Sequence, residues 1–494
     1  MQPGVPLPIL VGPDADRKLG VIPIRKLLIA NRGEIAVRLI RACAEMGITS
    51  VAVFTDADRH GLHVKKADEA YSIGPDTMGG YLSIHRLINI ARAAGCDAVH
   101  PGYGFLSENP DFAAACAERG IRFVGPSAEV IRRMGDKVAA REAMIAAGVP
   151  VVPGSEGNLP DVEAALADAE RVGYPVMLKA TNGGGGRGIR LCTDPENLRR
   201  NFDRVRSEAT RAFGSTEIFL EKAVVNPRHI EVQILADSQG DVVHLFERDC
   251  SIQRRHQKLV EIAPSPQLTD DQRAWLGEMA VTAARAVNYE NAGTVEFLMD
   301  SDDSFYFMEM NTRVQVEHPV TEMITGVDIV QEQLRVAAGL PLRYRQEEIS
   351  RRGYAIEFRI NAEDPENDFL PSFGRITRYF APGGPGIRTD GAIYTGYQIP
   401  PQYDSMCAKL VCWALDWDSL LNRADRALRD IGVYGVKTTI PYHLAIVDHP
   451  DFRSGRFDTG FIAAHPELSQ IHGTPSNRNL AVAIAAALAA HHGL

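Results

Sequence analysis

The clearest pattern along the chain is an alternation of polar and mostly apolar side chains from Glu309 to Glu317. Successive side chains of an extended chain point to opposite faces, so the pattern predicts a strand with a polar face and a core face. The polar positions are Glu309, Asn311, Arg313, Gln315 and Glu317. Full extension at about 3.3 Å per residue would span about 26 Å, too long for one reacting centre. We therefore expect the strand to curl into a loop after about Asn311.

Near the start of the chain, apolar runs alternate with a helical pattern. An apolar run from Lys26 to Ala30 leads into a stretch with one apolar helical face, and a second apolar run follows from Ser50 to Thr55. Strand, helix and strand in this order predict an open parallel α/β unit that extends to about residue 135. The unit lacks a G-x-G-x-x-G motif, so no nicotinamide or flavin cofactor is indicated.

Two stretches rich in proline and glycine divide the remainder of the chain into segments of different predicted structure. The stretch from Pro153 to Pro160 predicts a hinge, and beyond it two strands, 175–180 and 217–222, flank a glycine loop. Strands with period-two alternation dominate from about 224 to 320, and after the Gly/Pro-rich passage 381–386 we expect short strands and one helix, roughly 419–431. The apolar stretch 480–490 is shorter than the ~20 residues that span a bilayer, so it predicts a surface or docking helix and no membrane span.

Composition and charge narrow the class of protein. The chain has 494 residues, 45% of them hydrophobic and 23% charged, as in a globular protein of several packed units. Its formal net charge of -10 argues against general nucleic-acid binding. The seven cysteines form no C-x-x-C pair, which favours a reducing, cytoplasmic location. The Pro- and Gly-rich start lacks the pattern of a signal peptide, so we expect a disordered arm.

Two acids on neighbouring strands predict a metal site. Glu296 and Glu309 flank an acidic turn, Asp300 to Ser304, and residues equidistant from a hairpin turn face each other. Two such carboxylates repel each other unless a cation lies between them, and their oxygens suit Mg²⁺ or Mn²⁺. The guanidinium of Arg313 suits a planar oxyanion. The structural alternative, a pair of solvent-facing acids, fits less well because both residues are embedded among apolar and aromatic side chains.

Two further segments suggest phosphate and anion binding. The loop Asn182 to Gly188 holds four consecutive glycines after a strand that contains Lys179, and backbone without side chains can approach a phosphate closely. Neither a P-loop nor a protein-kinase motif accompanies it. The basic segment Arg248 to Lys258 fits an anionic substrate better than nucleic acid in a chain of this charge. A flexible turn and a solvated basic loop are the alternatives, and His229 taken alone could equally be a core histidine.

Together, these segments resemble those of biotin carboxylases, which belong to the ATP-grasp superfamily. The resemblance runs from about Arg25 to Glu467. The motifs occur in family order: IANRGEIAVR, HPGYGFLSEN, KATNGGGGRGI, EKAVVNPRHIEVQI, RDCSIQRRHQK, EMNTRVQVEHPVTE, EFRINAED and YDSMCAKL.

The resemblance implies a fold and a division of the chain. The fold is α/β and α+β: an ATP-grasp fold with an N-terminal open parallel α/β (pre-ATP-grasp) domain, a mobile glycine-rich lid and a C-terminal β-rich domain. The expected parts are a disordered arm at 1–23, the N-terminal domain at 24–135, the ATP-grasp domain at 136–338 with its lid at about 153–223, the C-terminal domain at 339–468 and a tail with a short apolar helix at 469–494.

The resemblance also implies a reaction, in which ATP and bicarbonate give carboxyphosphate and its CO₂ equivalent is placed on N1′ of biotin attached to a carrier protein. Lys258, Arg313, Gln315 and Val316 would bind bicarbonate, with Glu317 as the general base. Arg359 would stabilise the biotin enolate, and Tyr103 and Asp404 would lie near the biotin ring. Glu296, Glu309 and Asn311 would bind Mg²⁺ or Mn²⁺ at two sites. The nucleotide would be bound by Lys137, Lys179, Gly185, Gly186, Glu221, Lys222, Val224, His229, Gln253 and His256, with Glu221, Lys222 and Val224 at the adenine.

Partners follow from the same resemblance. The family often has a bulky aromatic residue near its dimer contact, whereas this chain has Pro385 and Gly386. Arg38, Arg41 and Glu45 still share one helix face, as a family-like dimer surface requires, so we expect a homodimer. The sequence contains no biotinyl-lysine motif of the Ala-Met-Lys-Met kind. We therefore expect the biotin carboxyl carrier protein and the carboxyltransferase on other chains.

The final acceptor of the carboxyl group is open at this point. The region around Trp413 and Trp417 and the segment GVYGVKTTIPYHL most resemble subunits of two-subunit pyruvate carboxylases, and acetyl-CoA carboxylase is the alternative. A carbamoyl-phosphate or purine-type synthetase would share the glycine loop and the metal-binding acids, but not RRHQK together with Glu317 and Arg359. A regulatory subunit with a residual nucleotide pocket is the non-catalytic alternative.

Overall fold

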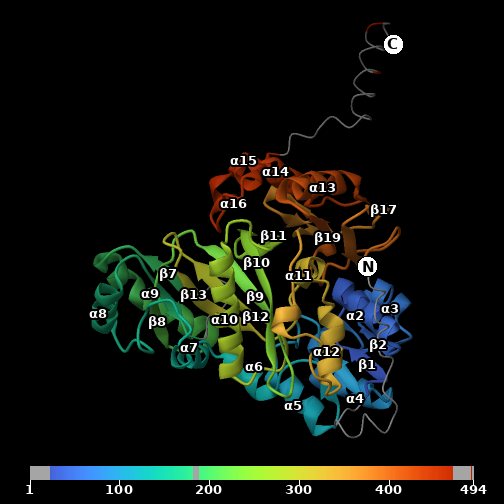
Figure 1. The fold of residues 1–494 in the computed structure, drawn as a ribbon, viewed down its shortest axis with the longest axis horizontal. Coiled ribbons are helices and arrows are strands. Elements are labelled where there is room, and N and C mark those ends of the chain that lie inside the picture. Colours follow the sequence, from blue (N-terminus) through green and yellow to red (C-terminus); the bar gives the residue numbers. More distant parts are fainter. Residues whose placement is uncertain (1–22, 182–187, 471–484, 486–490, 492–494) are drawn as a thin grey trace.

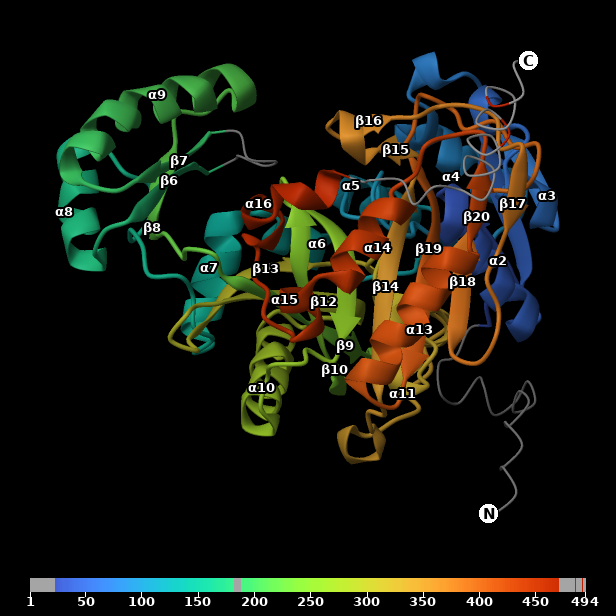
Figure 2. The ribbon, with the colours of Figure 1, turned by 90° about the horizontal axis from the view of Figure 1, so that it is seen from above.

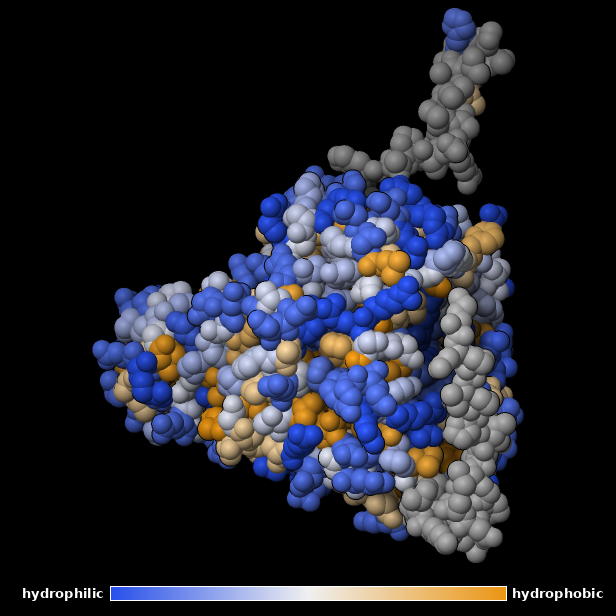
Figure 3. Space-filling model, in the orientation of Figure 1, coloured by the Kyte–Doolittle hydropathy of each residue, from blue (hydrophilic) through white to orange (hydrophobic). Residues whose placement is uncertain are grey.

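The computed structural model describes residues 23–181, 188–470, 485 and 491 (Figure 1). The arm expected at the start, the centre of the glycine loop and nearly all of the expected apolar helix at 480–490 lie outside these residues. Within the described part, no helix is both long enough and apolar enough to cross a membrane. The face seen in Figure 3 is mostly hydrophilic, with apolar residues gathered in small patches between polar ones.

Five parallel strands form the N-terminal sheet, as the strand–helix–strand pattern predicts. They are β1 Lys26–Ile29, β2 Thr49–Phe54, β3 Glu69–Ser72, β4 Ala98–His100 and β5 Arg122–Phe123, in the order β3-β2-β1-β4-β5. The helices of this part are α2 Gly33–Met46, α3 Leu62–Lys66, α4 Ile84–Ala93, α5 Pro110–Glu118 and α6 Ala128–Gly135. Because strand order reverses between β1 and β4, the loops that follow them meet at one edge, where such sheets bind ligands. Asn31 joins the two loops by donating to the carbonyls of Pro101 and Tyr103, both at 2.7 Å.

An eight-stranded sheet with antiparallel pairings forms the body of the molecule. Its order is β13-β12-β9-β10-β11-β14-β19-β18. The strands are β9 Arg228–Ala236, β10 Val242–Arg254, β11 Gln257–Ala263, β12 Asn291–Met299, β13 Phe305–Asn311, β14 Tyr354–Asn361, β18 Ile387–Gly391 and β19 Met406–Ala414. The helices beside it are α10 Asp270–Ala286, α11 His318–Thr325 and α12 Ile329–Ala337. The pairing of β11 with β14 carries this sheet across the boundary expected at residues 338 and 339.

A small lobe stands to one side of this body (Figure 2). It contains the antiparallel strands β6 Val176–Ala180, β7 Ile189–Cys192 and β8 Ile218–Lys222, with helices α8 Val162–Val172 and α9 Pro195–Phe213. Asp161 and Asp194 cap the two helices by accepting backbone N–H groups at their N-termini. The lobe has its own core, in which Leu178, Leu198 and Leu220 are fully buried. It corresponds to the segment expected to act as a lid, and α7 Lys137–Ala146 precedes it.

The C-terminal part holds more helix than the sequence pattern indicated. Its small strands are β15 Glu363–Asp364, β16 Leu370–Pro371, β17 Arg378–Phe380 and β20 Gly432–Tyr434. The helix expected at 419–431 is α13 Trp417–Asp430, but α14 Ile440–Asp448, α15 Pro450–Arg453 and α16 Phe461–Ala464 follow it. The expectation of a single helix was therefore wrong. Helices of four to nine residues are too short to show a helical period in the sequence.

Candidate active site

The β12–β13 hairpin brings together the acids that the alternating pattern selected. Glu296 and Glu309 are cross-strand partners. β13 ends at Asn311, and the chain then runs irregularly until α11 begins at His318. The expected curl after Asn311 is therefore confirmed, and Arg313, Gln315 and Glu317 lie in the loop beyond the strand.

Lys258, near the start of β11, occupies the centre of the site. Its ammonium group donates to Glu231 Oε2 at 2.6 Å, Glu296 Oε1 at 3.0 Å and Glu317 Oε1 at 2.6 Å. Gln315 Oε1 is a fourth acceptor at 3.2 Å. The lysine side chain is 13% exposed, and the three carboxylates are buried. Lys258 is thus a cation shared by three buried anions, each of which would be costly without a nearby positive charge.

Glu317, which was predicted to be the general base, lies between two cations. Its Oε1 accepts from Lys258, and its Oε2 accepts from Arg359 Nη2 at 3.1 Å. Burial alone would raise the pKa of this carboxyl, but Lys258, Arg359 and Arg248 outweigh burial and hold the pKa well below its ordinary value. Glu317 is therefore ionised and a weak base in this arrangement. It becomes a stronger base when one of these cations turns to another anion.

A second group of acids lies beside Arg359. Arg359 on β14 donates from Nε to Glu261 Oε1 at 2.5 Å, and Glu261 is the cross-strand partner of Glu357. Burial raises the pKa of Glu261 to about 7, and burial also raises that of Glu357 well above its ordinary value. The site therefore pairs an acid that stays ionised, Glu317, with acids that hold protons near neutral pH. Separated pKa values of this kind are typical of catalytic sites.

The predicted metal-binding set suits a hard divalent cation. Glu296 accepts from His229 at 2.8 Å and from the amides of Asn311 and Gln315, both at 2.9 Å. Opposite it, Glu309 borders two cavities, and burial followed by repulsion from Glu296 raises its pKa. A cation beside these carboxylates would remove the repulsion, and oxygen donors are what Mg²⁺ and Mn²⁺ prefer. The residues present therefore fit such an ion.

A cavity of about 390 Å³ opens beside Glu309, between the lobe and the hairpin. Lys137 and Lys179 line it together with Glu221, and Lys179 forms an ion pair with Glu221. Leu298 and Phe307 contribute apolar wall, so the cavity combines a flat apolar surface with cations, as a nucleotide site does. A second cavity of about 190 Å³ is lined by Glu108, Lys137, Glu309 and Asn311.

Four other residues predicted to bind the nucleotide do not line this cavity: Lys222, Val224, Gln253 and His256. The ammonium group of Lys222 donates to the carbonyls of Gly173 at 3.0 Å and Tyr174 at 3.2 Å. Val224 and Gln253 are half-buried, and the amide of Gln253 donates to the carbonyl of Cys250 at 3.5 Å. His256 is exposed in the turn between β10 and β11. Gly185 and Gly186 lie outside the described residues.

The loop after β4 reaches the site. Arg313 donates from Nε to Glu108 Oε2 at 2.9 Å and from Nη2 to Asn311 Oδ1 at 2.8 Å. Tyr103, from the same loop, donates its hydroxyl to Glu34, and burial together with Glu34 raises the pKa of that hydroxyl.

Asp404, predicted to lie near the biotin ring, and Val316, predicted to bind bicarbonate, make backbone contacts in this structure. Asp404 is exposed and accepts the backbone N–H of Met406 at 2.7 Å. The carbonyl of Val316 accepts from Lys409 Nζ at 2.6 Å.

Several buried charges in the site were missed by sequence reasoning. They are Glu34, Glu231, Glu261, Glu357 and Lys409, together with Arg248, which was recognised only as the start of a basic segment. The exposed Glu108, which pairs with Arg313, was missed as well. Arg248 is fully buried, forms an ion pair with Glu231, and donates to Gln233 at 2.8 Å and to Thr294 at 3.0 Å. A signal did exist for β9, because His229, Glu231 and Gln233 alternate with apolar residues in the same way as the run that begins at Glu309. Glu357 likewise alternates with Arg359 and Asn361 along β14, whereas Glu261 and Lys409 have no polar side chain two positions away in their strands.

Three family models together match most of the chain. The biotin carboxylase N-terminal domain matches residues 23–131, and the biotin carboxylase C-terminal domain matches residues 357–464. Between them, the ATP binding domain of the carbamoyl-phosphate synthase L chain matches residues 136–345.

Curated relatives match over nearly their whole length. The 2-oxoglutarate carboxylase small subunit of Hydrogenobacter thermophilus is 52% identical over 95% of this chain and 100% of its own. The biotin carboxylase of a Nostoc species is 54% identical over 88% of this chain and 98% of its own. A pyruvate carboxylase subunit of Methanothermobacter thermautotrophicus is 52% identical over 88% of this chain and 89% of its own.

Solved structures of biotin carboxylases also match this chain. The biotin carboxylase domain dimer of Hydrogenobacter thermophilus 2-oxoglutarate carboxylase, in complex with MgADP, ADP and bicarbonate, matches with a TM-score of 0.86 and 54% identity over 91% of this chain and 99% of that one. The biotin carboxylase subunit of a pyruvate carboxylase matches with a TM-score of 0.81 and 53% identity over 90% of this chain and 99% of that one. With its buried charge cluster beside a nucleotide-sized cavity, this chain therefore belongs to the biotin carboxylase family and is an ATP-dependent ligase of the ATP-grasp superfamily.

Proposed function

We propose that this chain uses ATP and bicarbonate to carboxylate biotin carried by a separate protein. The observation that carries the proposal is the cluster in which Lys258 and Arg359 hold Glu317 close to the acidic hairpin. Such a cluster offers a site for a small planar anion next to a site for a divalent cation and nucleotide phosphates. A relative crystallised with MgADP and bicarbonate supports the same combination of ligands.

In the proposed first step, bicarbonate binds to Lys258 and Arg313. Lys258 then shares its charge with the substrate, so its hold on Glu317 weakens and the pKa of Glu317 rises. Glu317 accepts the bicarbonate proton, and the resulting oxyanion forms a bond to the γ-phosphorus of ATP as the bond to ADP breaks. The products are carboxyphosphate and ADP. A cation at Glu296, Glu309 and Asn311 would neutralise charge on the phosphate oxygens when bound.

In the proposed second step, carboxyphosphate breaks down to CO₂ and phosphate, the released phosphate accepts the N1′ proton of biotin, and N1′ forms a bond to the CO₂. Arg359 stabilises the negative charge on the biotin oxygen, and its two carboxylate partners fix the direction of its guanidinium. The small lobe, residues 153–223, closes over the cavity and excludes water from carboxyphosphate.

The test is the ATP hydrolysis of the purified chain with bicarbonate and free biotin varied independently. We expect hydrolysis to require bicarbonate and to rise when biotin is added. Hydrolysis that is stimulated by ammonia or an amino acid instead would contradict the proposal and favour a carbamoyl-phosphate or purine-type synthetase.

For the complete reaction, we propose that the carrier and the carboxyltransferase are other chains and that the acceptor is a 2-oxo acid, with pyruvate favoured. Relatives named as subunits of pyruvate and 2-oxoglutarate carboxylases support this choice over acetyl-CoA carboxylase. The experiment is to purify the chain from its native source and identify the biotinylated protein that accompanies it. A partner complex that carboxylates acetyl-CoA but neither 2-oxo acid would refute the choice.

We also propose that the chain works as a homodimer through the face around α2. A cleft of about 340 Å³ there is lined by Arg38, Arg41, Glu45 and Arg388, and Arg38 is largely buried and donates to Glu322 at 3.0 Å. The relative that crystallised as a dimer supports the proposal. Sedimentation should give the mass of a dimer, and Arg41→Glu should shift it toward the monomer. A wild-type monomer at micromolar concentration would contradict it.

A further inference from the structure

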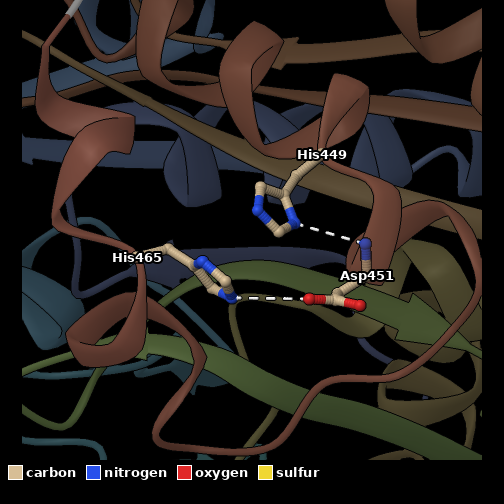
Figure 4. Close-up of side chains that lie close together, drawn as sticks. All are labelled: His449, Asp451 and His465. Atoms are coloured by element: carbon tan, nitrogen blue, oxygen red, sulfur yellow. Dashed lines mark hydrogen bonds and ion pairs between the residues drawn. The ribbon is translucent and has the colours of Figure 1, made fainter.

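A cluster of metal-binding side chains lies outside the active site, near the end of the described chain (Figure 4). His449 follows α14, Asp451 lies in α15, and His465 precedes the short 3₁₀-helix Pro466–Ser469. Their possible ligand atoms lie within 4.8 Å of one another. Two other groups of this kind among the described residues belong to the buried cluster around Glu231. The present cluster differs because Asp451 is 40% exposed, so an ion can reach it from solvent.

A fourth side chain, Glu467, hydrogen-bonds His465 and lies near His449. Its Oε1 lies 2.9 Å from His465 Nδ1 and 3.7 Å from His449 Nε2. A neutral His465 that donates from Nδ1 keeps a lone pair on Nε2, which lies 3.7 Å from Asp451 Oδ2. On the other ring, His449 Nδ1 accepts the backbone N–H of Asp451 at 3.2 Å, so a metal that binds this nitrogen must displace that hydrogen bond. His465 therefore places an unprotonated nitrogen toward Asp451 and its N–H toward Glu467, the arrangement that prepares histidine for a metal, and His449 can join it by exchanging a backbone N–H for the ion.

The spacing suits a borderline metal ion. Two ligand atoms at about 2.1 Å from a tetrahedral Zn²⁺ lie about 3.4 Å apart, so His465 Nε2 and Asp451 Oδ2 need to approach by only a few tenths of an ångström. The ring centroids of His449 and His465 are 4.1 Å apart, a distance at which two protonated rings would repel each other. Arg456 holds the other oxygen of Asp451, Oδ1, at 2.9 Å and leaves Oδ2 available.

We propose that His449, Asp451 and His465 form a binding site for a divalent transition metal such as Zn²⁺, with Glu467 as the outer carboxylate. Two imidazoles and one carboxylate favour Zn²⁺ over Mg²⁺, which prefers an all-oxygen shell. The site joins α15 to the chain just before the 3₁₀-helix and so encloses α16, whose Phe461 packs against both histidine rings. Bound metal thereby fastens the last described segment to the body, because α16 contacts β10.

The test is isothermal titration of Zn²⁺ into the full-length, chelator-treated protein in excess Mg²⁺. We expect one Zn²⁺ site that is lost in His465→Gln and in Asp451→Asn. Glu467→Gln should weaken the site about tenfold, the usual effect of losing an outer carboxylate. Wild-type protein without a Zn²⁺ site, or variants that keep it, would overturn the proposal.

Two controls separate this site from other histidines and from misfolding. The double replacement His491→Ala and His492→Ala, near the C-terminus, should leave the titration unchanged, and loss of Zn²⁺ binding there would also overturn the proposal. Arg456→Ala keeps every ligand and removes a neighbouring positive charge, so it should tighten Zn²⁺ binding. If Arg456→Ala binds Zn²⁺ equally or more weakly than the wild type, the assignment of Asp451 as a ligand is contradicted. This result does not depend on whether His465→Gln or Asp451→Asn folds.

Discussion

Replacing Lys258 by Met tests whether one ammonium group compensates three buried carboxylates. Met has a similar length and no charge, so Glu231, Glu296 and Glu317 lose ion pairs of 2.6, 3.0 and 2.6 Å, respectively. Removing one partner of a buried ion pair typically costs about 3–5 kcal/mol. Because Arg248 and Arg359 still face two of the acids, we expect the lower end of this range, about 3 kcal/mol, at pH 8.

The pH dependence of this loss has a definite sign. In the wild type, Lys258 lowers the pKa of both Glu296 and Glu317 against the effect of burial, so their stabilising contribution is present above the ordinary glutamate pKa and disappears in acid. Without Lys258, the pKa values of both carboxyls rise in the folded state. Relative to the wild type, the folded variant then loses stability as these carboxyls ionise with rising pH. The stability deficit should therefore be larger at pH 8 than at pH 5.

Urea unfolding followed by tryptophan fluorescence at both pH values measures this deficit. Lys66→Met, which removes an exposed lysine, is the matched control and should cost little. A deficit of less than about 1 kcal/mol at pH 8, the value expected of an exposed pair, would refute the reasoning. So would a deficit that is larger at pH 5.

Three further outcomes are expected. Arg359→Ala should leave ATP binding largely intact and lower the rate of biotin carboxylation by about 10²-fold or more, as loss of one oxyanion donor does; unchanged carboxylation would count against its role. Glu309→Gln should raise the Mg²⁺ concentration needed for half-maximal ATP hydrolysis at least about tenfold, and an unaltered requirement would remove Glu309 from the metal site. Gly386→Ala should lower stability by about 1–3 kcal/mol, because its Cβ would overlap the carbonyl oxygen of Trp413; Gly95→Ala, with the same φ of +68° and open space around it, is the control and should cost clearly less.

Local patterns predicted the elements, but not how distant elements pair. The parallel N-terminal sheet and the end of β13 at Asn311 follow from period and length. Glu296 and Glu309 do face each other as predicted, but a register shift between Glu296 and Phe297 brings them opposite each other, and no local pattern encodes that shift. The pairing of β11 with β14 joins residues almost a hundred positions apart, and no local pattern encodes it. Helices α14 to α16 were missed because each is too short to show its period.

The same limit applies to the site. Residues that alternate within one segment were identified from the sequence, as Glu309 and Glu317 show. Glu261 was not identified, because it has no polar side chain two positions away in β11 and acquires its meaning only from its cross-strand partner Glu357. This chain has Gly386 where the family often has a bulky aromatic residue nearby, and the sequence alone gave no reason for the glycine. The structure gives one, because a side chain at Gly386 would collide with the neighbouring strand.

The continuous eight-stranded sheet also determines how this chain can be divided. A fragment that ended at residue 338 would leave the edge of β11 unpaired, and its complement would expose the edge of β14. Exposed edges of this kind recruit other strands. The two halves are therefore not interchangeable modules: any graft that joins the first 338 residues to a different C-terminal half must supply a strand in register with Val260 to Ala263. Among the described residues, the three strands of the small lobe form a sheet of their own and do not pair with the large sheet, so the lobe is the part that can be exchanged with the least disturbance to it.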